Sequence, residues 1–423
     1  MRYLRQLLLF SYKATTTLRN DKLAQAYSTF VSTNSSVRDY GNCLSKQSPP
    51  LLNEVRRLCQ SVLFKVRPRD IIPSHGPGAV TTSKDVWKKR YSTIEYLYPQ
   101  SDWFSLYYNR DHLAALEDSV DEDIIEAKVV AVPKDSRGPR LICVHPAESI
   151  WIQQGLRREL ERAISLTRRY QGPWPKGHVN FDDQTVNGRI ALRSSLTGQY
   201  ATLDLKEASD RLSETLVQVL FGPYYKWFGC CRAQRYIIPA TSAYAGAQGD
   251  IACYAPMGNA TTFPVQSLVF WAISVATLQS LGVHHPNSAF VFGDDIIVPS
   301  GAAQAVINSL ESFGLLVNRT KSFWRGAFRE SCGVDAFNGV DVTPIRWKTT
   351  MNAEYLTGLQ SISDLAMRFR IAGYEGAACS LYREIQKRLY RFRGKREKKL
   401  SITNNPDHGG IAEFSTNELL GWR

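Results

Sequence analysis

Two adjacent aspartates in a short turn are the residues of this chain best suited to chemistry. The segment Phe292-Gly293-Asp294-Asp295 lies between two apolar runs, residues 289–291 and 296–298, that are typical of strands. The glycine lets the chain reverse, so both carboxylates would point away from the hairpin. Two hard oxygen ligands this close together suit a divalent cation, most naturally Mg²⁺ bound to a phosphate-bearing substrate. Acidic residues are also ordinary turn formers, so the segment alone does not decide between these interpretations.

A third aspartate, Asp204, ends a strand-like run within residues 200–205, and Asp210 follows at a predicted helix start. If that strand lies beside the Gly-Asp-Asp hairpin in one sheet, three carboxylates converge. Carboxylates that close repel one another or take up protons unless cations are present. Two Mg²⁺ ions would relieve the repulsion, and such a pair supports in-line phosphoryl transfer. The alternative for Asp204 and for Asp210 is that each caps the helix that follows.

A glycine loop, Met257-Gly258-Asn259-Ala260-Thr261-Thr262, stands between these two acidic segments. Its small residues would let a polynucleotide backbone approach closely, while its amide and hydroxyl side chains donate hydrogen bonds to a ribose. The alternative is a simple helix N-terminus.

Cationic residues gather at two further places. Lys134, Arg137 and Arg140 lie in and beside the loop of a predicted hairpin at 127–144, where they would cover an incoming triphosphate. A predicted basic helix at 381–400 suits contact with an RNA duplex. For both groups the alternative is a solvated, charged surface. The RNA-binding candidates in the helix are Arg383, Lys387, Arg391, Arg393 and Arg396.

The formal net charge of the 423-residue chain is +13, an excess that attracts polyanions over the whole surface. Nucleic acid is the natural partner. Membrane headgroups are the competing polyanion, but the apolar run at 7–10 is too short for a secretory signal. Residues 251–293 contain no Asp, Glu, Lys or Arg, but polar side chains interrupt them at short intervals. That pattern favours a helix buried beneath the hairpin over a membrane span. The eight cysteines lack C-x-x-C spacing, which favours reduced, mostly buried cytosolic thiols over a zinc site.

Taken in order, these segments resemble the RNA-directed RNA polymerases, and within them the replicase (beta) subunit of the single-stranded RNA bacteriophages (levivirus type). The resemblance is firm over residues 127–346. Two runs, Arg329-Glu330-Ser331-Cys332-Gly333 and Gly339-Val340-Asp341-Val342-Thr343-Pro344, are far more specific to phage replicases than the Gly-Asp-Asp turn. The other segments that carry it are Ala131-Val132-Pro133-Lys134-Asp135-Ser136, Asp182-Asp183-Gln184-Thr185-Val186-Asn187, Leu203-Asp204-Leu205, Ala208-Ser209-Asp210 and Met257-Gly258-Asn259.

The resemblance implies an α+β fold shaped as a right hand, in which an antiparallel palm sheet is backed by helices. Residues 1–197 would form the fingers with an N-terminal helical region, and 223–250 would be an insertion in the fingers. The palm would consist of 198–222 and 251–345. The thumb and the basic C-terminal region would occupy 346–423.

By the same resemblance, Asp204, Asp294 and Asp295 are catalytic ligands of two Mg²⁺ ions, for which Mn²⁺ would be a substitute. Asp204 and Asp294 would be the principal ligands, with Asp295 assisting. Lys321 would stand near the pyrophosphate leaving group, although a plain surface lysine is the alternative.

The resemblance also implies a nucleotide site around Asp210, which would sense the ribose 2′-hydroxyl. Its partner would be Asn259 or Thr262, next to Gly258. Gln266 lies one helical turn beyond Thr262, so the sequence leaves open which side chain completes the contact.

The implied substrates are a single-stranded RNA template, nascent RNA and ribonucleoside triphosphates, in the cytoplasm of a bacterial host and without a membrane. Relatives work with host translation elongation factors and a ribosomal protein; this chain is shorter than the better-known relatives, which leaves those partners open. Phe292 stands where the family usually has tyrosine, which keeps the ring. A reverse transcriptase-like polymerase is one rival, disfavoured by an acceptor at Asp210. A non-catalytic RNA-binding protein on a polymerase scaffold is another, disfavoured by the three carboxylates.

Overall fold

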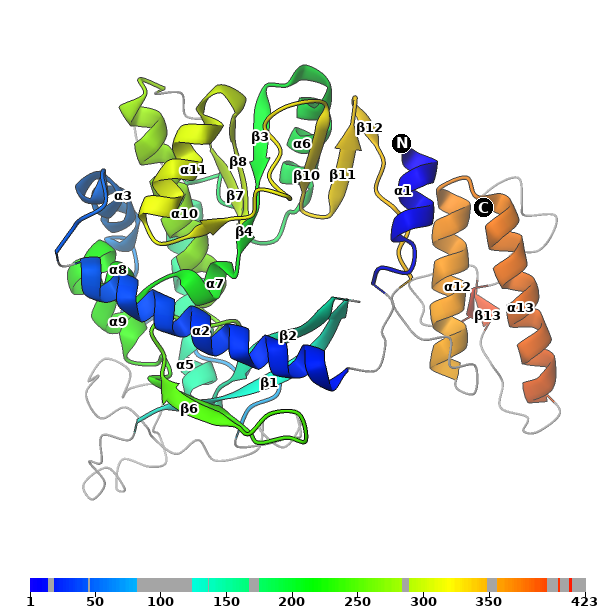
Figure 1. Ribbon diagram of the computed structural model, residues 1–423, viewed down its shortest axis with the longest axis horizontal. Helices are drawn as coiled ribbons and strands as arrows, with labels where there is room; N and C mark the ends of the chain where they lie inside the picture. Colours follow the sequence, from blue (N-terminus) through cyan, green and yellow to red (C-terminus); the bar gives the residue numbers. More distant parts are fainter. Residues whose placement is uncertain are drawn as a thin grey trace. The chain divides into compact units, whose positions relative to one another are not determined.

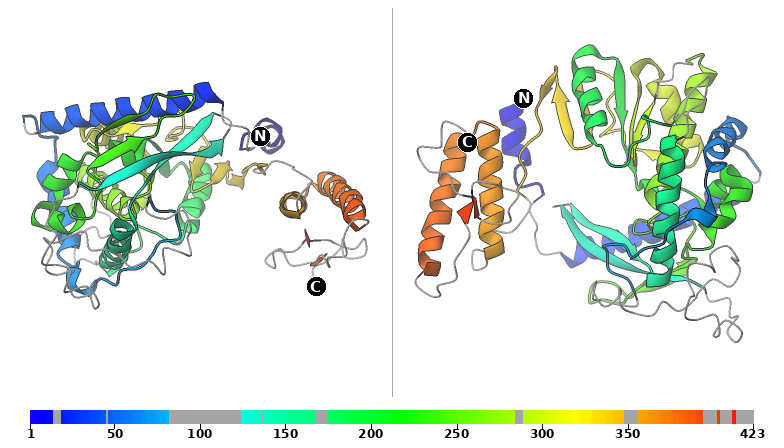
Figure 2. Two further views of the ribbon diagram at one scale, coloured as in Figure 1. Left: turned by 90° about the horizontal axis from the view of Figure 1, so that it is seen from below. Right: turned by 180° about the vertical axis from the view of Figure 1, so that it is seen from behind.

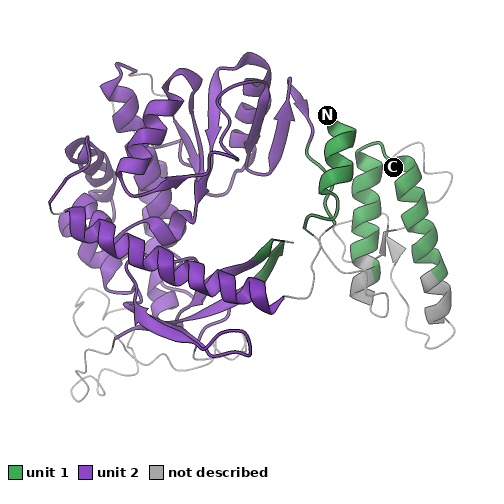
Figure 3. Ribbon diagram, in the orientation of Figure 1, with its two compact units in different colours: residues 1–18, 133–138, 343–423 green, residues 19–132, 139–342 purple. Residues whose placement is uncertain are grey.

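The computed structural model describes residues 1–13, 19–44, 46–81, 124–135, 137–166, 175–283, 289–347, 356–393, 402–403 and 411–412. They combine helices with strands and fall into two compact units (Figure 3). We call Met1–Leu18, Pro133–Gly138 and Thr343–Arg423 the terminal unit, and Arg19–Val132 with Pro139–Val342 the central unit.

The central unit contains the three candidate metal ligands, Asp210 and the glycine loop. Its short 3-10 turns are η1 (Pro68–Asp70), η3 (Gly222–Tyr224) and η4 (Ser300–Ala302). Its helices are α2 (Asn20–Leu44), α3 (Leu52–Leu63), α5 (Ala147–Leu166), α6 (Thr185–Thr197), α7 (Ala208–Arg211), α8 (Glu214–Phe221), α9 (Tyr225–Gly229), α10 (Thr262–Ser280) and α11 (Ala303–Ser312) (Figure 1).

A three-stranded antiparallel sheet carries the Gly-Asp-Asp turn. Its central strand is β8 (Asp295–Pro299), which pairs with β7 (Phe290–Phe292) on one side and β3 (Tyr200–Leu203) on the other. The predicted hairpin is therefore confirmed. The predicted strand at 200–205 divides instead at Asp204, after which β4 (Leu205–Lys206) pairs with β9 (Leu316–Val317) in a separate antiparallel ladder.

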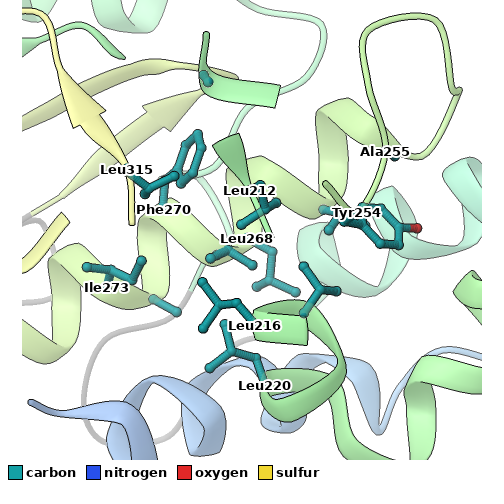
Figure 4. Close-up of a cluster of buried hydrophobic side chains, with 14 of the residues drawn as sticks. Leu212, Leu216, Leu220, Tyr254, Ala255, Leu268, Phe270, Ile273 and Leu315 are labelled. Carbon is teal, nitrogen blue, oxygen red and sulfur yellow. The ribbon is translucent and has the colours of Figure 1, made fainter. Parts of the chain in front are cut away.

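Helix α10 confirms the expectation of a buried helix beneath the hairpin, since it is buried almost throughout and contacts β7 and β8. Leu268, Phe270 and Ile273 belong to the same hydrophobic core as Leu216 and Leu220 of α8 (Figure 4). Removing such side chains from water is the main favourable contribution to folding. Within the described ranges, no helix is both long and apolar enough to cross a bilayer.

Three hydroxyl side chains of α10 are hydrogen-bonded within the helix itself. The hydroxyls of Ser267, Ser274 and Thr277 each donate to the carbonyl oxygen four residues earlier, at 2.7, 2.8 and 2.8 Å. Buried polar groups that are hydrogen-bonded in this way cost little on burial. This explains how an uncharged but polar-interrupted sequence forms a core helix.

The segment 223–250, expected to be an insertion in the fingers, contains a pair of strands. It contains β5 (Arg235–Ile238) and β6 (Ala247–Asp250), which are antiparallel to each other. β5 also pairs in parallel with β1 (Glu126–Asp135), whose other neighbour is β2 (Gly138–Val144). Parallel pairing joins strands that are distant in sequence and therefore leaves no local signal.

A further sheet consists of β10 (Phe328–Ser331), β11 (Val334–Phe337) and β12 (Val340–Asp341), and with its two turns it contains residues 329–333 and 339–341 of the phage-specific runs. Both connections are two-residue turns with positive φ at each residue. The angles are 49° and 79° at Cys332-Gly333, and 50° and 77° at Asn338-Gly339. Two positive φ values define the type I′ turn, which matches the twist of paired strands. The motif residues thus build two tight hairpins.

In the terminal unit, α12 (Leu356–Ile371) and α13 (Glu375–Arg393) lie side by side (Figure 2). The N-terminal α1 (Arg2–Leu9) joins them: the Gln6 amide pairs with both backbone groups of Ile345, and the Phe10 ring stacks on Trp347. The helix expected at 381–400 begins earlier, and residues 394–400 lie outside the described part. Two short parallel strands, β13 (Ile402–Thr403) and β14 (Ile411–Ala412), complete the unit.

Candidate active site

Asp204 lies where the chain passes from one sheet to another. Leu203 pairs with Ile296 of β8, so the next position along this antiparallel register places Asp204 opposite Asp295. The prediction that this strand lies beside the hairpin is confirmed. The next helix, α7, has Glu207 rather than Asp204 at its N-cap, so the capping interpretation of Asp204 is wrong.

The Gly-Asp-Asp turn needs its glycine for two reasons. Gly293 has a φ of +64°, and a Cβ there would lie 2.4 Å from the Phe263 ring. Its N–H donates to Ser267 Oγ at 3.2 Å, which ties the turn to α10. Asp294 at the tip is exposed, whereas Asp295 is half-buried.

Asp295 receives hydrogen bonds from the β10–β11 hairpin, a contact that sequence reasoning missed. The Cys332 N–H donates to Asp295 Oδ2 at 3.1 Å, and Ser331 Oγ lies 3.4 Å from Oδ1. From α6, Asn187 Nδ2 donates to the backbone oxygen of Asp295 at 3.4 Å. The Ser-Cys-Gly run marked this position in the sequence, but nothing local indicated that its type I′ turn faces Asp295.

The electrostatics of Asp295 reflect crowded negative charge. Burial, followed by the carboxylates of Asp294 and Asp204, raises the pKa of Asp295 to about 7, while the bonds from Cys332 oppose the rise. Hard oxygen ligands that repel one another fit a divalent cation. In the described part of the chain, however, no three His, Cys, Asp or Glu side chains are grouped closely enough to hold one ion as they stand.

The raised pKa of Asp295 predicts that Asp295→Asn stabilises the fold at alkaline pH without divalent cations. An unfolded aspartate titrates near pH 4, so between about pH 4 and 7 unfolding releases a proton and the free energy of unfolding falls as pH rises. At pH 8 the variant should gain on the order of 4 kcal/mol, and at pH 4 nothing. Urea unfolding at both pH values measures this.

Asp183→Asn is the matched control, and its effect on stability should have the opposite sign. Hydrogen bonds from the hydroxyl and N–H of Thr185 lower the pKa of Asp183, whereas the pKa of Asp295 is raised. That variant should lose stability at pH 8. Equal urea midpoints for wild type and Asp295→Asn at pH 8 would contradict the claim that burial and the neighbouring carboxylates raise the pKa of Asp295.

Side chains of the segment that follows β9 contact Asp204. Asn318 Nδ2 donates to Asp204 Oδ2 at 2.8 Å, and Lys321 Nζ lies 3.9 Å from the same oxygen. Ser322 Oγ accepts the Asp204 N–H at 3.0 Å. The sequence singled out Lys321, which the structure does place beside Asp204. Asn318 and Ser322 were missed, because their position follows from the β4–β9 register.

Asp210 and the glycine loop come together. Asp210 lies inside α7 rather than at its N-cap, so its capping interpretation is wrong. Burial, followed by the charge of Glu207, raises the pKa of Asp210 to about 6, and a hydrogen bond from the Met257 N–H opposes the rise. Gly258 has a φ of +122°, and a Cβ there would lie 2.1 Å from the Cys143 oxygen. Close backbone contact therefore fixes this loop beside Asp210.

Two side chains of the loop differ in what they can still bind. Asn259 is buried, and its Oδ1 accepts from the N–H and Oγ1 of Thr261, both at 2.8 Å. Its Nδ2 has no hydrogen-bond partner among the described residues. The Thr262 hydroxyl already faces the Ala255 and Pro256 oxygens, each at 3.1 Å. Asn259 is thus the better-placed donor, and Gln266 has a buried Oε1 without a partner in the described part.

The predicted cationic cover is split between the units. Arg140 belongs to the central unit, whereas Lys134 and Arg137 belong to the terminal unit. The Arg137 guanidinium pairs with Asp135 at 2.8 Å and lies over the Tyr12 ring. In α13, Arg383 and Lys387 are exposed. Arg391 and Arg393 fall in the last turn of α13, where the structure describes no side chains, and Arg396 lies outside the described residues.

The comparisons with known proteins point in one direction. The RNA-directed RNA polymerase subunit beta of Qbeta virus (strain MX1) is 35% identical over 221 residues, covering 51% of this chain and 34% of its own. The corresponding beta chain of Escherichia phage MS2 is 32% identical over 219 residues, covering 51% and 36%. The chain therefore spans only about a third of the length of these relatives.

Two solved structures are distant neighbours. The RNA-dependent RNA polymerase of a human picorbirnavirus has a TM-score of 0.41 at 11% identity, covering 62% of this chain and 56% of its own. The BmCPV RNA-dependent RNA polymerase at elongation state has a TM-score of 0.46 at 14% identity, covering 85% and 36%. A family model described as RNA replicase, beta-chain matches residues 105–362, more than half of the chain. This chain therefore belongs to the RNA replicase beta-chain family.

Proposed function

We propose that this chain is an RNA-directed RNA polymerase that copies a single-stranded RNA phage genome by nucleotidyl transfer from ribonucleoside triphosphates. The observation that carries the proposal is the register that sets Asp204 opposite Asp295, next to the exposed Asp294, within a replicase-family chain. The experiment that tests it is RNA-templated incorporation of ribonucleotides by the purified chain with Mg²⁺.

Asp204 and Asp294, assisted by Asp295, would hold two Mg²⁺ ions, or Mn²⁺ in their place. When bound, the metals lower the pKa of an attacking hydroxyl and stabilise the leaving oxygen. The chain's own residues position these ligands: the Cys332 amide orients Asp295, and the Ser267 hydroxyl fixes the turn that presents Asp294. Lys321, whose Nζ lies 3.9 Å from Asp204 Oδ2, would face the pyrophosphate leaving group.

The nucleotide site would lie around Asp210 and Gly258. The candidate cations for the triphosphate are Lys134, Arg137 and Arg140. At neutral pH the carboxylate of Asp210 is mostly ionised and can accept a hydrogen bond from the ribose 2′-hydroxyl. Asn259 Nδ2 supplies a donor at the same place. Thr262 contributes mainly by holding the loop through its carbonyl contacts.

Asp210→Ala should lose part of the preference for ribonucleotides over deoxynucleotides. A site built around a hydrogen bond to the 2′-hydroxyl leaves a buried acceptor unpaired with a deoxynucleotide, which costs on the order of 1–3 kcal/mol. The preference should therefore fall roughly tenfold or more, through poorer ribonucleotide use. Single-turnover incorporation of matched ribo- and deoxynucleotides measures the ratio.

The exposed Asp250 provides the control for this variant, since Asp250→Ala removes a carboxylate from the surface. Circular dichroism checks that the helices are retained. An unchanged sugar preference in a folded Asp210→Ala protein would remove Asp210 from the nucleotide site.

In the right-hand description, the palm comprises residues 198–222 and 251–345, with the sheet of β3, β8 and β7 at its centre. Residues 1–197 and 223–250 would form the fingers, and 346–423 the thumb, although α1 belongs to the same compact unit as α12 and α13. Arg383, Lys387, Arg391, Arg393 and Arg396 would contact the phosphates of template and nascent RNA, in keeping with the net charge of +13. The chain would work in the cytoplasm of the bacterial host, where translation elongation factors and a ribosomal protein are candidate partners.

A further inference from the structure

The carboxylate of Asp204 accepts a hydrogen bond from Asn318, a residue to which the proposed mechanism gives no role. We infer that Asn318 is a positioning residue, which fixes one carboxylate oxygen of Asp204 and thereby sets the metal affinity of the site. The inference rests on the proposed function and deepens it.

The backbone places Asn318 beside Asp204. Leu205 pairs with Val317 in the antiparallel β4–β9 ladder, so the next position along that register sets Asn318 opposite Asp204. The Asn318 N–H donates to the Asp204 carbonyl oxygen at 2.8 Å, and its side-chain Nδ2 donates to Oδ2 at the same distance. Two contacts between one pair of residues hold both the main chain and the carboxylate.

A second side chain determines which end of the Asn318 amide faces Asp204. Thr320 Oγ1 donates to Asn318 Oδ1 at 2.8 Å, so the amide oxygen is occupied and the NH₂ group turns to the carboxylate. On the far side, buried Ser322 accepts the Asp204 N–H. Asn318 and Ser322 therefore hold Asp204 directly, and Thr320 holds it through Asn318.

The chemistry of the donor matters. An amide hydrogen bond orients a carboxylate without neutralising it, whereas a cation in the same place competes with the metal. Lys321 is such a cation, but its side chain is 41% exposed and its Nζ is 3.9 Å away. Groups that orient metal ligands in this way typically contribute 10–100-fold to metal affinity or activity. Asn318, the neutral and closer donor, is thus the group that sets the geometry.

Titration of the purified chain with Mn²⁺, followed by electron paramagnetic resonance of the free ion, tests the inference. Asn318→Ala should weaken binding by roughly 10–100-fold. Thr320→Val should also weaken Mn²⁺ binding, but by less than Asn318→Ala does. Thr320→Ser, which retains the hydroxyl, should bind Mn²⁺ with wild-type affinity. Asn308→Ala is the matched control, because Asn308 is an exposed asparagine of α11 whose Oδ1 accepts a hydrogen bond from Gln304 Nε2.

Urea unfolding provides a readout that requires neither metal nor catalysis. Asn318→Ala and Asp204→Ala should each lower the free energy of unfolding. If Asn318 and Asp204 are in contact, these two losses should sum to more than the loss in the double variant. Additive losses, or equal Mn²⁺ affinity of folded Asn318→Ala and wild type, would overturn the inference and leave the proposed function standing. Unchanged Mn²⁺ binding in both Asp204→Asn and Asp294→Asn would overturn the proposed metal site, and this inference with it.

Discussion

Asp294→Asn should reduce RNA-templated nucleotide incorporation by on the order of 10³-fold while leaving the fold and RNA binding nearly intact. Asp294 is exposed at the tip of the turn, so its replacement removes no packing. It does remove one negative charge from a site where metal affinity depends on ligand charge. Single-turnover incorporation at several Mg²⁺ concentrations, with RNA binding measured in parallel, tests the expectation.

Asp39→Asn is the control for this substitution, because Asp39 is an exposed aspartate on α2, away from the sheet of β3, β8 and β7. It should keep wild-type activity. If Asp294→Asn retained more than a few per cent of wild-type incorporation, the assignment of Asp294 as a principal metal ligand would be wrong.

Gly258→Ala should destabilise the protein by on the order of 3 kcal/mol or more and abolish incorporation. The added Cβ would lie 2.1 Å from the Cys143 oxygen, a backbone atom that cannot move without disturbing β2. The loop must shift instead, which breaks the 2.8 Å bond between the Cys143 N–H and the Met257 oxygen. It also displaces the Met257 N–H from Asp210. Urea unfolding and single-turnover incorporation measure both effects.

Gly282→Ala is the matched control, since Gly282 has a φ of +77° with no atom within 4 Å of an added Cβ. Its replacement costs only the backbone strain of a non-glycine residue, roughly 1 kcal/mol. A Gly258→Ala protein as stable as Gly282→Ala would show that the contact between the loop and β2 does not hold the loop in place.

Local patterns predicted the elements that carry the candidate site. The apolar runs on either side of Gly293 predicted the hairpin, because a glycine between two apolar segments is a strong turn signal. The uncharged run 251–293 gave the buried helix α10, whose hydroxyls bond within the helix. The strand ending at Asp204 followed from the same reasoning, and the structure sets it beside β8.

Contacts between distant segments could not be predicted in this way. The β4–β9 pairing brings Asn318 to Asp204, and it joins two strands that lie more than 100 residues apart in the sequence. The type I′ turn at Cys332 is encoded locally, but its contact with Asp295 depends on how β10 lies against β3. The packing of α1 in the terminal unit is likewise a contact of high sequence separation. Such contacts are decided by burial and backbone register rather than by local propensity.

Template-directed extension of a primer annealed to RNA, by the purified chain, tests the central claim most directly because it bypasses initiation. Two templates that differ at one base should each direct incorporation of the complementary ribonucleotide, and only when Mg²⁺ or Mn²⁺ is added. Incorporation that ignores the template base, or a chain that binds the primer–template but never extends it with either metal, would contradict the account.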